Sequence, residues 1–444
     1  MKKGLLYTIA SFTCVSLIYA SPVTAAEPME TALFAGAAKI DVTPEIDNLP
    51  TPLNEVNDPL YIRALYIESQ DIPALIIAID VPAIAPDIFS ALLETISNNY
   101  AIPEANIILS VTHTHNSLRV ANPGPSPIPT SAAFTKAVKD GTLEVVKDAI
   151  SQKQAAKYGF STAQSSLIVS RNEWLPNESR YVDGTDRTGL EEVDQTFGIL
   201  HFESLSDKPI AAVLNLGIQP VVFEPAKNIV SGDVPGATSN YVEAALGEDY
   251  VALFTVGAPA SPAYRVWSKD KPSRTAKTAR TIMNAMGVIL GEESLAQIDY
   301  MTMSEKPFEI SSAVDSFTCS GKKTTPRNLK SHCDMDDETD LPACIHVDEP
   351  FPDVKLSLGV LRLGDLAYLT SDSNVTPALW NIFKAGSTLA HPQLVGTNFG
   401  PFRFVVNDAA YALNTYPATD TRAQSGCAQS GFISTLNALL QKTE

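Results

Sequence analysis

Segments with the alternation of a β-strand and segments with helical spacing follow one another along the whole chain, and this pattern constrains the fold most strongly. No internal repeat and no low-complexity linker divides the 444 residues. With a hydrophobic content of 45%, the pattern predicts an α/β fold, a single large domain of mixed β-sheets surrounded by helices. Strands are predicted at 35–42, 61–68, 74–81, 107–112, 196–203, 209–218 and 250–256, and helices at 86–97, 132–152, 236–246, 273–290 and 430–441.

The first residues have the composition of a secretory signal. Lys2 and Lys3 precede an apolar stretch over 4–20, and small residues follow at 23–26. We therefore interpret 1–26 as a signal peptide and 27–444 as the folded domain, and we expect the protein to be exported to the periplasm or secreted. No other stretch has the roughly 20 apolar residues that a transmembrane span requires.

The charge of the chain argues against several classes of partner. The formal net charge is -18, from 32 Lys and Arg against 50 Asp and Glu. Binding to a phosphate backbone depends on clustered Lys and Arg, so we expect no nucleic-acid partner. An acidic chain is equally unsuited to an anionic membrane surface.

The cysteines favour disulfides. Cys14 lies inside the signal segment, which leaves Cys319, Cys333, Cys344 and Cys427. An even number in an exported protein favours disulfide bonds, and three pairings are open. Three of the four fall in the segment 316–350, which is rich in Lys, Asp and Pro and which we interpret as a cross-linked surface excursion. The spacing lacks the Cys-x-x-Cys pattern of a zinc knuckle.

The strand predicted at 107–112 ends in Thr112-His113-Thr114-His115, which contains two of only six histidines. Strand side chains alternate in direction, so residues i and i+2 of a strand point to the same side. Two imidazoles placed in this way suit a metal site or an acid/base pair. The alternative is a hydrogen-bonded histidine pair at the edge of a sheet.

Several short motifs resemble the neutral and alkaline ceramidase family, and they occur in that family's order. The segment 34–44 (FAGAAKIDVTP) resembles the family's opening strand, and 112–115 (THTH) resembles its metal-binding strand end. Further similarities lie at 170–172, 208–211, 231–236 and 257–262, so the resemblance covers about 34–420. It implies the ceramidase fold without that family's C-terminal immunoglobulin-like domain, for which no residues remain.

The resemblance also implies an activity and a set of site residues. Ceramidases hydrolyse the amide bond of ceramide to sphingosine and a fatty acid with one zinc ion. His113 matches the first zinc ligand and His115 the histidine that contacts the reacting group. Arg171, Tyr416 and Ser261 match the catalytic arginine, tyrosine and nucleophilic serine, with Ser261 in the loop that 257–262 is expected to form.

The remaining zinc ligands of the family are replaced. Gln219 stands where the resemblance places a histidine, Asn374 where it places a glutamate and Phe404 where it places a tyrosine. Amide oxygens are poor zinc ligands and phenylalanine is none. An alternative metal set would combine His113 and His115 with two carboxylates, Asp233 and Asp372.

Simpler structural roles are open for the same residues. Ser261 precedes Pro262 and suits a turn, Arg171 can pair with one of the many acids, and Tyr416 can be a packed aromatic residue. Asp233 is also a suitable N-cap for the helix that follows it.

Three functional hypotheses follow. The first is an exported amidohydrolase that acts on ceramide or another N-acyl compound with an altered zinc site. The second is a non-catalytic relative that binds a lipid or a glycan. The third is a hydrolase that uses serine chemistry without metal, in which His115 or His113 would serve as the general base for Ser261.

Overall fold

The computed structural model describes Met1 and residues 33–122, 128–176, 180–189, 191–224, 227–265, 272–323, 333–335, 342–344 and 347–444. Apart from Met1, the predicted signal peptide, including Cys14, lies outside the described residues. The same holds for His332 and His346 in the cysteine-containing segment.

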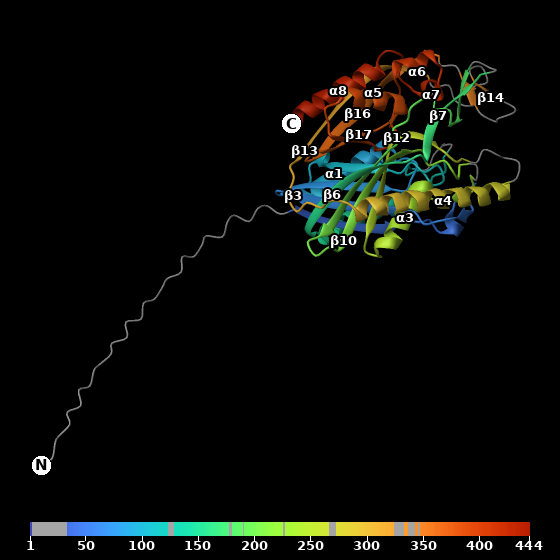
Figure 1. Cartoon of the computed structure of the whole chain (residues 1–444). Helices are drawn as coiled ribbons and strands as arrows, with labels where there is room; N and C mark the ends of the chain where they lie inside the picture. Colours follow the sequence, from blue (N-terminus) through green and yellow to red (C-terminus); the bar gives the residue numbers. More distant parts are fainter. Residues whose placement is uncertain are drawn as a thin grey trace.

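The described chain forms two stacked β-sheets with helices on both outer sides (Figure 1). The large sheet has ten strands and is mixed, because β4 pairs with β5 and β10 with β12 in parallel while the other pairs are antiparallel. Its order is β5 (Ile107–Val111), β4 (Ile72–Ile79), β3 (Tyr61–Ser69), β1 (Leu33–Asp41), β6 (Gln154–Gln164), β9 (Thr196–Ser204), β10 (Pro209–Ile218), β12 (Val251–Pro262), β7 (Ile168–Leu175) and β8 (Arg180–Asp186). This architecture confirms the predicted fold class.

The second sheet is smaller and covers one face of the large sheet. It consists of β13 (Ile310–Lys322), β16 (Pro350–Leu363), β17 (Leu366–Ser371) and β19 (His391–Gly396). Apolar side chains of both sheets form the core between them, among them Leu65, Val213 and Leu361. The large sheet is buried on both faces, which explains why β10 reads as an almost continuous apolar run.

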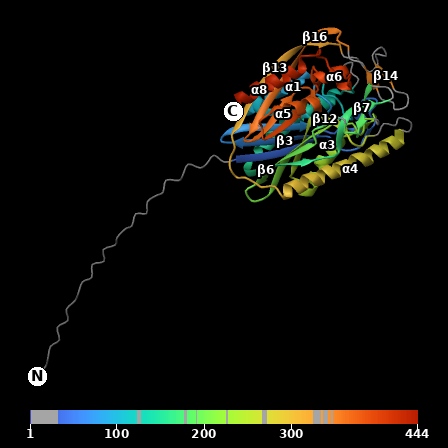
Figure 2. The same ribbon diagram turned by 45° about the horizontal axis from the view of Figure 1, so that its top comes forward.

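Helices cover the two outer faces. The helices α1 (Pro86–Tyr100), α2 (Ala132–Ser151), α3 (Asp233–Leu246) and α4 (Pro272–Asp299) pack on the large sheet, and α5 (Pro377–Gly386) and α8 (Ala428–Lys442) pack on the small one. Figures 1 and 2 show α4 and α8 on opposite outer sides of the molecule. None of the described helices is long and apolar enough to cross a membrane.

One predicted boundary is wrong in a way that matters for the site. The strand predicted at 250–256 continues to Pro262, so 257–262 is part of β12 and not a loop. The extension is held on both sides, because Gln219 donates its backbone N–H to the Ala260 carbonyl and Ser261 pairs with Val169 of β7. A bulge at Gly217 permits the first contact, since a Cβ there would lie 2.2 Å from the Ala258 carbonyl oxygen.

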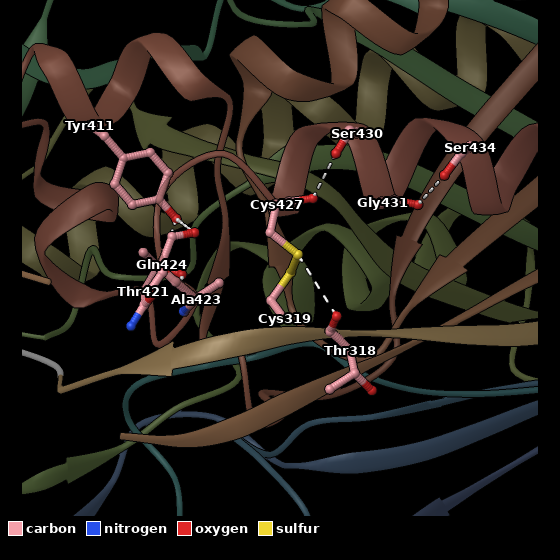
Figure 3. Close-up of a disulfide and its surroundings, with 10 residues drawn as sticks. All are labelled: Thr318, Cys319, Tyr411, Thr421, Ala423, Gln424, Cys427, Ser430, Gly431 and Ser434. Carbon is pink, nitrogen blue, oxygen red and sulfur yellow. Dashed lines mark hydrogen bonds between the residues drawn. A yellow bond between two sulfur atoms is a disulfide. The ribbon is translucent and has the colours of Figure 1, made fainter. Parts of the chain in front are cut away.

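A disulfide joins Cys319 of β13 to Cys427, the residue before α8 (Figure 3). It confirms the expectation of disulfides and selects one pairing for these two cysteines. The backbones of Cys333 and Cys344 are register partners in the short pair β14 (Cys333–Met335) and β15 (Pro342–Cys344). Residues 316–322 differ from the expected surface excursion, because they extend β13 and pair with β16.

Candidate functional site

A pocket of about 310 Å³ lies where the chain leaves β5 and β10, beside β7 and the C-terminal segments. Its walls include the short parallel pair β18 (Asn374–Val375) and β20 (Phe404–Val405), in which Asn374 and Phe404 are register partners, and the start of α7 (Tyr416–Asp420). Seven residues selected from the sequence line this one pocket: His113, His115, Arg171, Gln219, Asn374, Phe404 and Tyr416.

His113 reaches the pocket through a turn. The strand β5 ends at Val111, and His113 has a φ of 60°, an uncommon value for a residue with a side chain. The two histidines therefore converge for a different reason than strand alternation, and their ring centroids lie 5.2 Å apart. His113 Nδ1 donates to the Pro82 carbonyl oxygen at 2.7 Å. Burial lowers the pKa of His113 to about 3, so this imidazole is neutral.

His115 is held at both ring nitrogens. The Nε2 group of Gln219 donates to His115 Nε2 at 3.0 Å, so the ring proton is on Nδ1 and donates to Glu224 Oε1 at 3.3 Å. Glu224 also forms an ion pair with Arg265 at 2.7 Å. Each ring nitrogen of His115 thus already has a partner in the protein.

Arg171 lines the pocket together with two aromatic rings. Its guanidinium lies 5.2 Å from the ring centroid of Phe404 and 4.9 Å from that of Tyr416. Its Nε donates to Asp183 Oδ1 of β8 at 3.0 Å, so Arg171 does pair with an acid, as one reading of the sequence expected. The ion pair and the rings fix the guanidinium at the pocket edge.

The residues at this pocket do not fit a zinc ion. His113 contributes one imidazole, whereas Gln219 and Asn374 contribute amides and Phe404 contributes none of the donors that zinc binds. The amide nitrogen of Gln219 is directed at His115. Within the described ranges, no group of three or more His, Cys, Asp or Glu side chains is arranged to hold a metal.

The alternative set with two carboxylates is not assembled either. Asp233 is fully buried at the start of α3, where its carboxylate accepts the backbone N–H groups of Phe223 and Val234. Burial raises its pKa to about 6. Asp372 accepts from Ser373 Oγ and the Ser357 backbone, and neither carboxylate lines the pocket with the histidines.

Ser261 is near this pocket in the fold but is not part of its lining. It is 1% exposed in β12, and its Oγ lies 3.2 Å from the hydroxyl oxygen of Thr185 on β8. The predicted nucleophile is therefore in contact with Thr185 of β8, and no described contact joins it to either histidine.

The structure adds site residues that the sequence analysis did not select. Glu224, Asp183, Arg403 and Ser117 contact or line the pocket. Ser117 follows His115 by two residues, and this closeness in sequence is the pattern that points to it. Asp183 and Glu224 are brought to their partners by strand pairing and loop packing, which no local pattern reports.

Several residues that line the pocket carry a buried polar atom without a hydrogen-bond partner among the described residues. Three of these atoms belong to neutral side chains, Gln219 Oε1, Asn374 Nδ2 and Ser117 Oγ, on residues that are 3%, 7% and 2% exposed, and another is Arg403 Nε. Buried polar atoms are usually paired, so unpaired atoms on residues around one cavity mark it as a place for a polar ligand.

No protein-family model and no curated protein sequence matches this chain. Among solved structures, it is similar to the neutral ceramidase from Pseudomonas aeruginosa, with a TM-score of 0.67 and 16% identity over 93% of this chain and 75% of that one. A ceramidase complexed with C2 has a TM-score of 0.66 and 15% identity over 93% of this chain and 76% of that one. At this identity the similarity establishes the fold.

Proposed function

We propose that this chain, which has the fold of the neutral ceramidases, is an exported amidohydrolase that cleaves the amide bond of ceramide or a related N-acyl compound. The observation that carries the proposal is the convergence of His115, Arg171 and Tyr416 on one pocket from separate segments of the chain. Apolar residues complete the lining and suit an acyl chain, among them Leu53, Ile128, Pro129 and Phe399.

The residues present would act without zinc. In the proposed reaction a serine hydroxyl oxygen adds to the acyl carbon and gives up its proton, the C–N bond breaks, and the leaving nitrogen takes up a proton. Water then cleaves the resulting ester, so that its oxygen enters the fatty acid and a proton returns to the serine. The Arg171 guanidinium and the Tyr416 side chain lie side by side at the pocket wall, where they would stabilise the developing oxyanion. Ser261 would serve as the nucleophile once its contact with Thr185 is broken.

A second candidate is a non-catalytic protein that binds an N-acyl lipid or a glycan in the same pocket. Two observations favour this candidate. Both ring nitrogens of His115 are engaged by Gln219 and Glu224, which leaves the imidazole no free position for a proton from the substrate. Ser261 has no described contact with a histidine.

Turnover of a panel of ceramides with different acyl chains, with and without 1,10-phenanthroline, tests the proposal. The purified full chain should release fatty acid and amine at a rate that the chelator does not change. Arg171→Ala and Tyr416→Phe should each lower kcat by about 100-fold or more, the size expected for loss of an oxyanion partner. Arg280→Ala, on the outer helix α4, is the matched control and should retain full activity.

The other outcomes separate the candidates. Binding of ceramide without turnover would support the non-catalytic protein, and absence of both binding and turnover would reject ceramide as the substrate or ligand of this pocket. Loss of chelator-resistant turnover in Ser261→Ala would identify the nucleophile. Activity that phenanthroline removes would contradict the zinc-free reaction.

A further inference from the structure

We infer that Gln219 and Asn374 bind the substrate's secondary amide directly, with Gln219 Oε1 accepting its N–H and Asn374 Nδ2 donating to its carbonyl oxygen. This inference rests on the proposed function, since it names how the same pocket selects its substrate. It reassigns two positions that the family resemblance gives to a metal. The ligand class is a secondary N-acyl amide held without any ion.

The burial and the unpaired polar atoms of the two side chains support this assignment. Gln219 and Asn374 are 3% and 7% exposed, and each has one polar atom without a partner among the described residues. The unpaired atom of Gln219 is an acceptor and that of Asn374 is a donor. A buried polar atom without a partner is unfavourable, so a ligand that pairs both atoms at once gains from each of them.

The orientation of Gln219 is fixed by its other end. Its Nε2 donates to His115 Nε2, and His115 is in turn held by Glu224. The amide oxygen of Gln219 is therefore the polar atom of this side chain that still lacks a partner among the described residues. Asn374 is fixed by its backbone, which lies in β18 and donates to the Arg403 carbonyl.

An acceptor and a donor on one pocket select an amide over related groups. A secondary amide presents one N–H and one carbonyl oxygen, which pair with Gln219 and Asn374 respectively. An ester keeps the carbonyl but places an oxygen against Gln219 Oε1, and a carboxylate places a charged oxygen there. Sites that hydrogen-bond a substrate group reject analogues that lack that group.

The experiment compares N-dodecanoylethanolamine with its ester analogue, ethylene glycol monododecanoate. These compounds differ only in the replacement of N–H by oxygen. Calorimetric titration of the full chain in EDTA should show at least tenfold tighter binding of the amide. Equal affinities, or amide binding that needs added zinc, would overturn the inference without use of any variant.

Two variants then separate the two contacts. Gln219→Met should remove the preference for the amide by weakening amide binding at least tenfold while ester binding stays within about twofold. Asn374→Leu should weaken both compounds by a similar factor, because both present a carbonyl oxygen. Asn381→Leu, a half-buried residue on α5 outside this pocket, is the matched control and should change neither affinity.

The binding test addresses the recognition of the amide and the turnover assay addresses its hydrolysis, so either proposal can be wrong while the other is right. Amide-selective binding without hydrolysis would support the recognition pair and contradict the amidohydrolase. Hydrolysis of ceramide with an amide preference that survives in Gln219→Met would support the enzyme and overturn the recognition pair.

Discussion

The buried polar groups of the charged cluster around Arg63 are paired with one another, whereas several of those at the pocket lack a partner among the described residues. Arg63 is 2% exposed and donates to Glu243 at 2.7 Å, to Asp80 at 3.1 Å and to Asn240 at 2.7 Å. Lys39 adds a second cation to Glu243. At the pocket, by contrast, Gln219, Asn374 and Ser117 each have a buried polar atom without a partner in the described part of the chain.

The difference separates a structural role from a binding role. The Arg63 cluster joins β3 to α3 and satisfies its own charges, so it has no need of a ligand. The pocket contains neutral side chains that each have one polar atom without a partner among the described residues, and a ligand can supply that partner. Unpaired atoms around a cavity are thus a better guide to the site of this protein than its most strongly charged residues.

Removal of the Arg63 side chain should give the largest effect on stability. Arg63→Leu leaves Asp80 and Glu243 as buried carboxylates without their main cation, and loss of one partner of a buried ion pair lowers the free energy of unfolding by about 3–5 kcal/mol. Urea unfolding followed by circular dichroism measures this change.

The control for this prediction is an ion pair in solvent. Arg280 pairs with Glu55 at 2.8 Å, but both side chains are exposed, so Arg280→Leu should lower the free energy of unfolding by less than about 1 kcal/mol. If Arg63→Leu and Arg280→Leu lowered the free energy of unfolding by similar amounts, burial would not make the ion pairs of Arg63 more important for stability than an exposed pair.

Asp233 tests a third arrangement, in which a buried carboxylate has hydrogen bonds but no cation. Burial raises its pKa to about 6, above the value of roughly 3.9 in an unfolded chain. Between these values the folded state binds the proton more tightly, so the contribution of Asp233 to stability is present at low pH and is lost as the pH rises through 6. The free energy of unfolding should therefore fall by about 1 kcal/mol more from pH 5 to pH 7 in the wild type than in Asp233→Asn.

This prediction depends on the difference between the two proteins, because Asp58 and Asp80 also have raised pKa values and Glu243 has a lowered one. Those groups remain in the variant, so the shifts of Asp80 and Glu243 cancel in the comparison. The charge of Asp58 acts on Asp233, so the difference between the two proteins includes that interaction. Parallel pH profiles for the two proteins would contradict it.

The sequence predicted those parts of the fold that local patterns report. The strand predicted at 209–218 coincides with β10, because its apolar run is buried on both faces. The chain over β6 to β8 was not predicted, since side chains such as Lys157, Ser161 and Gln164 are partly or fully exposed and give no clear period. The extension of β12 through Ser261 depends on pairing with β7, a contact between distant segments.

For the site, too, the sequence predicted one part, the lining residues, and did not predict another, the contacts between their side chains. The resemblance selected seven residues that do line one pocket, because motif order carries information about distant contacts that single residues lack. It could not show that Gln219 points its amide nitrogen at His115, that Asp183 holds Arg171, or that Ser261 bonds to Thr185. These contacts depend on side-chain packing, and they decide what chemistry the pocket can perform.

The smallest effect on stability is expected for a buried serine at the pocket, Ser117, and it can be compared directly with a buried serine outside the pocket, Ser231. Ser117 Oγ has no partner among the described residues, whereas Ser231 Oγ donates to Asp58 and accepts the backbone N–H of Asp233 at 3.0 Å. Ser117→Ala should change the free energy of unfolding by no more than about 0.5 kcal/mol, because the hydroxyl makes no hydrogen bond to any residue that the structure describes. Ser231→Ala should lower it by about 1–3 kcal/mol, because it leaves buried polar groups unpaired. Urea unfolding of both variants measures the contrast, and a loss in Ser117→Ala equal to that in Ser231→Ala would mean that the pocket hydroxyl is already satisfied without a ligand.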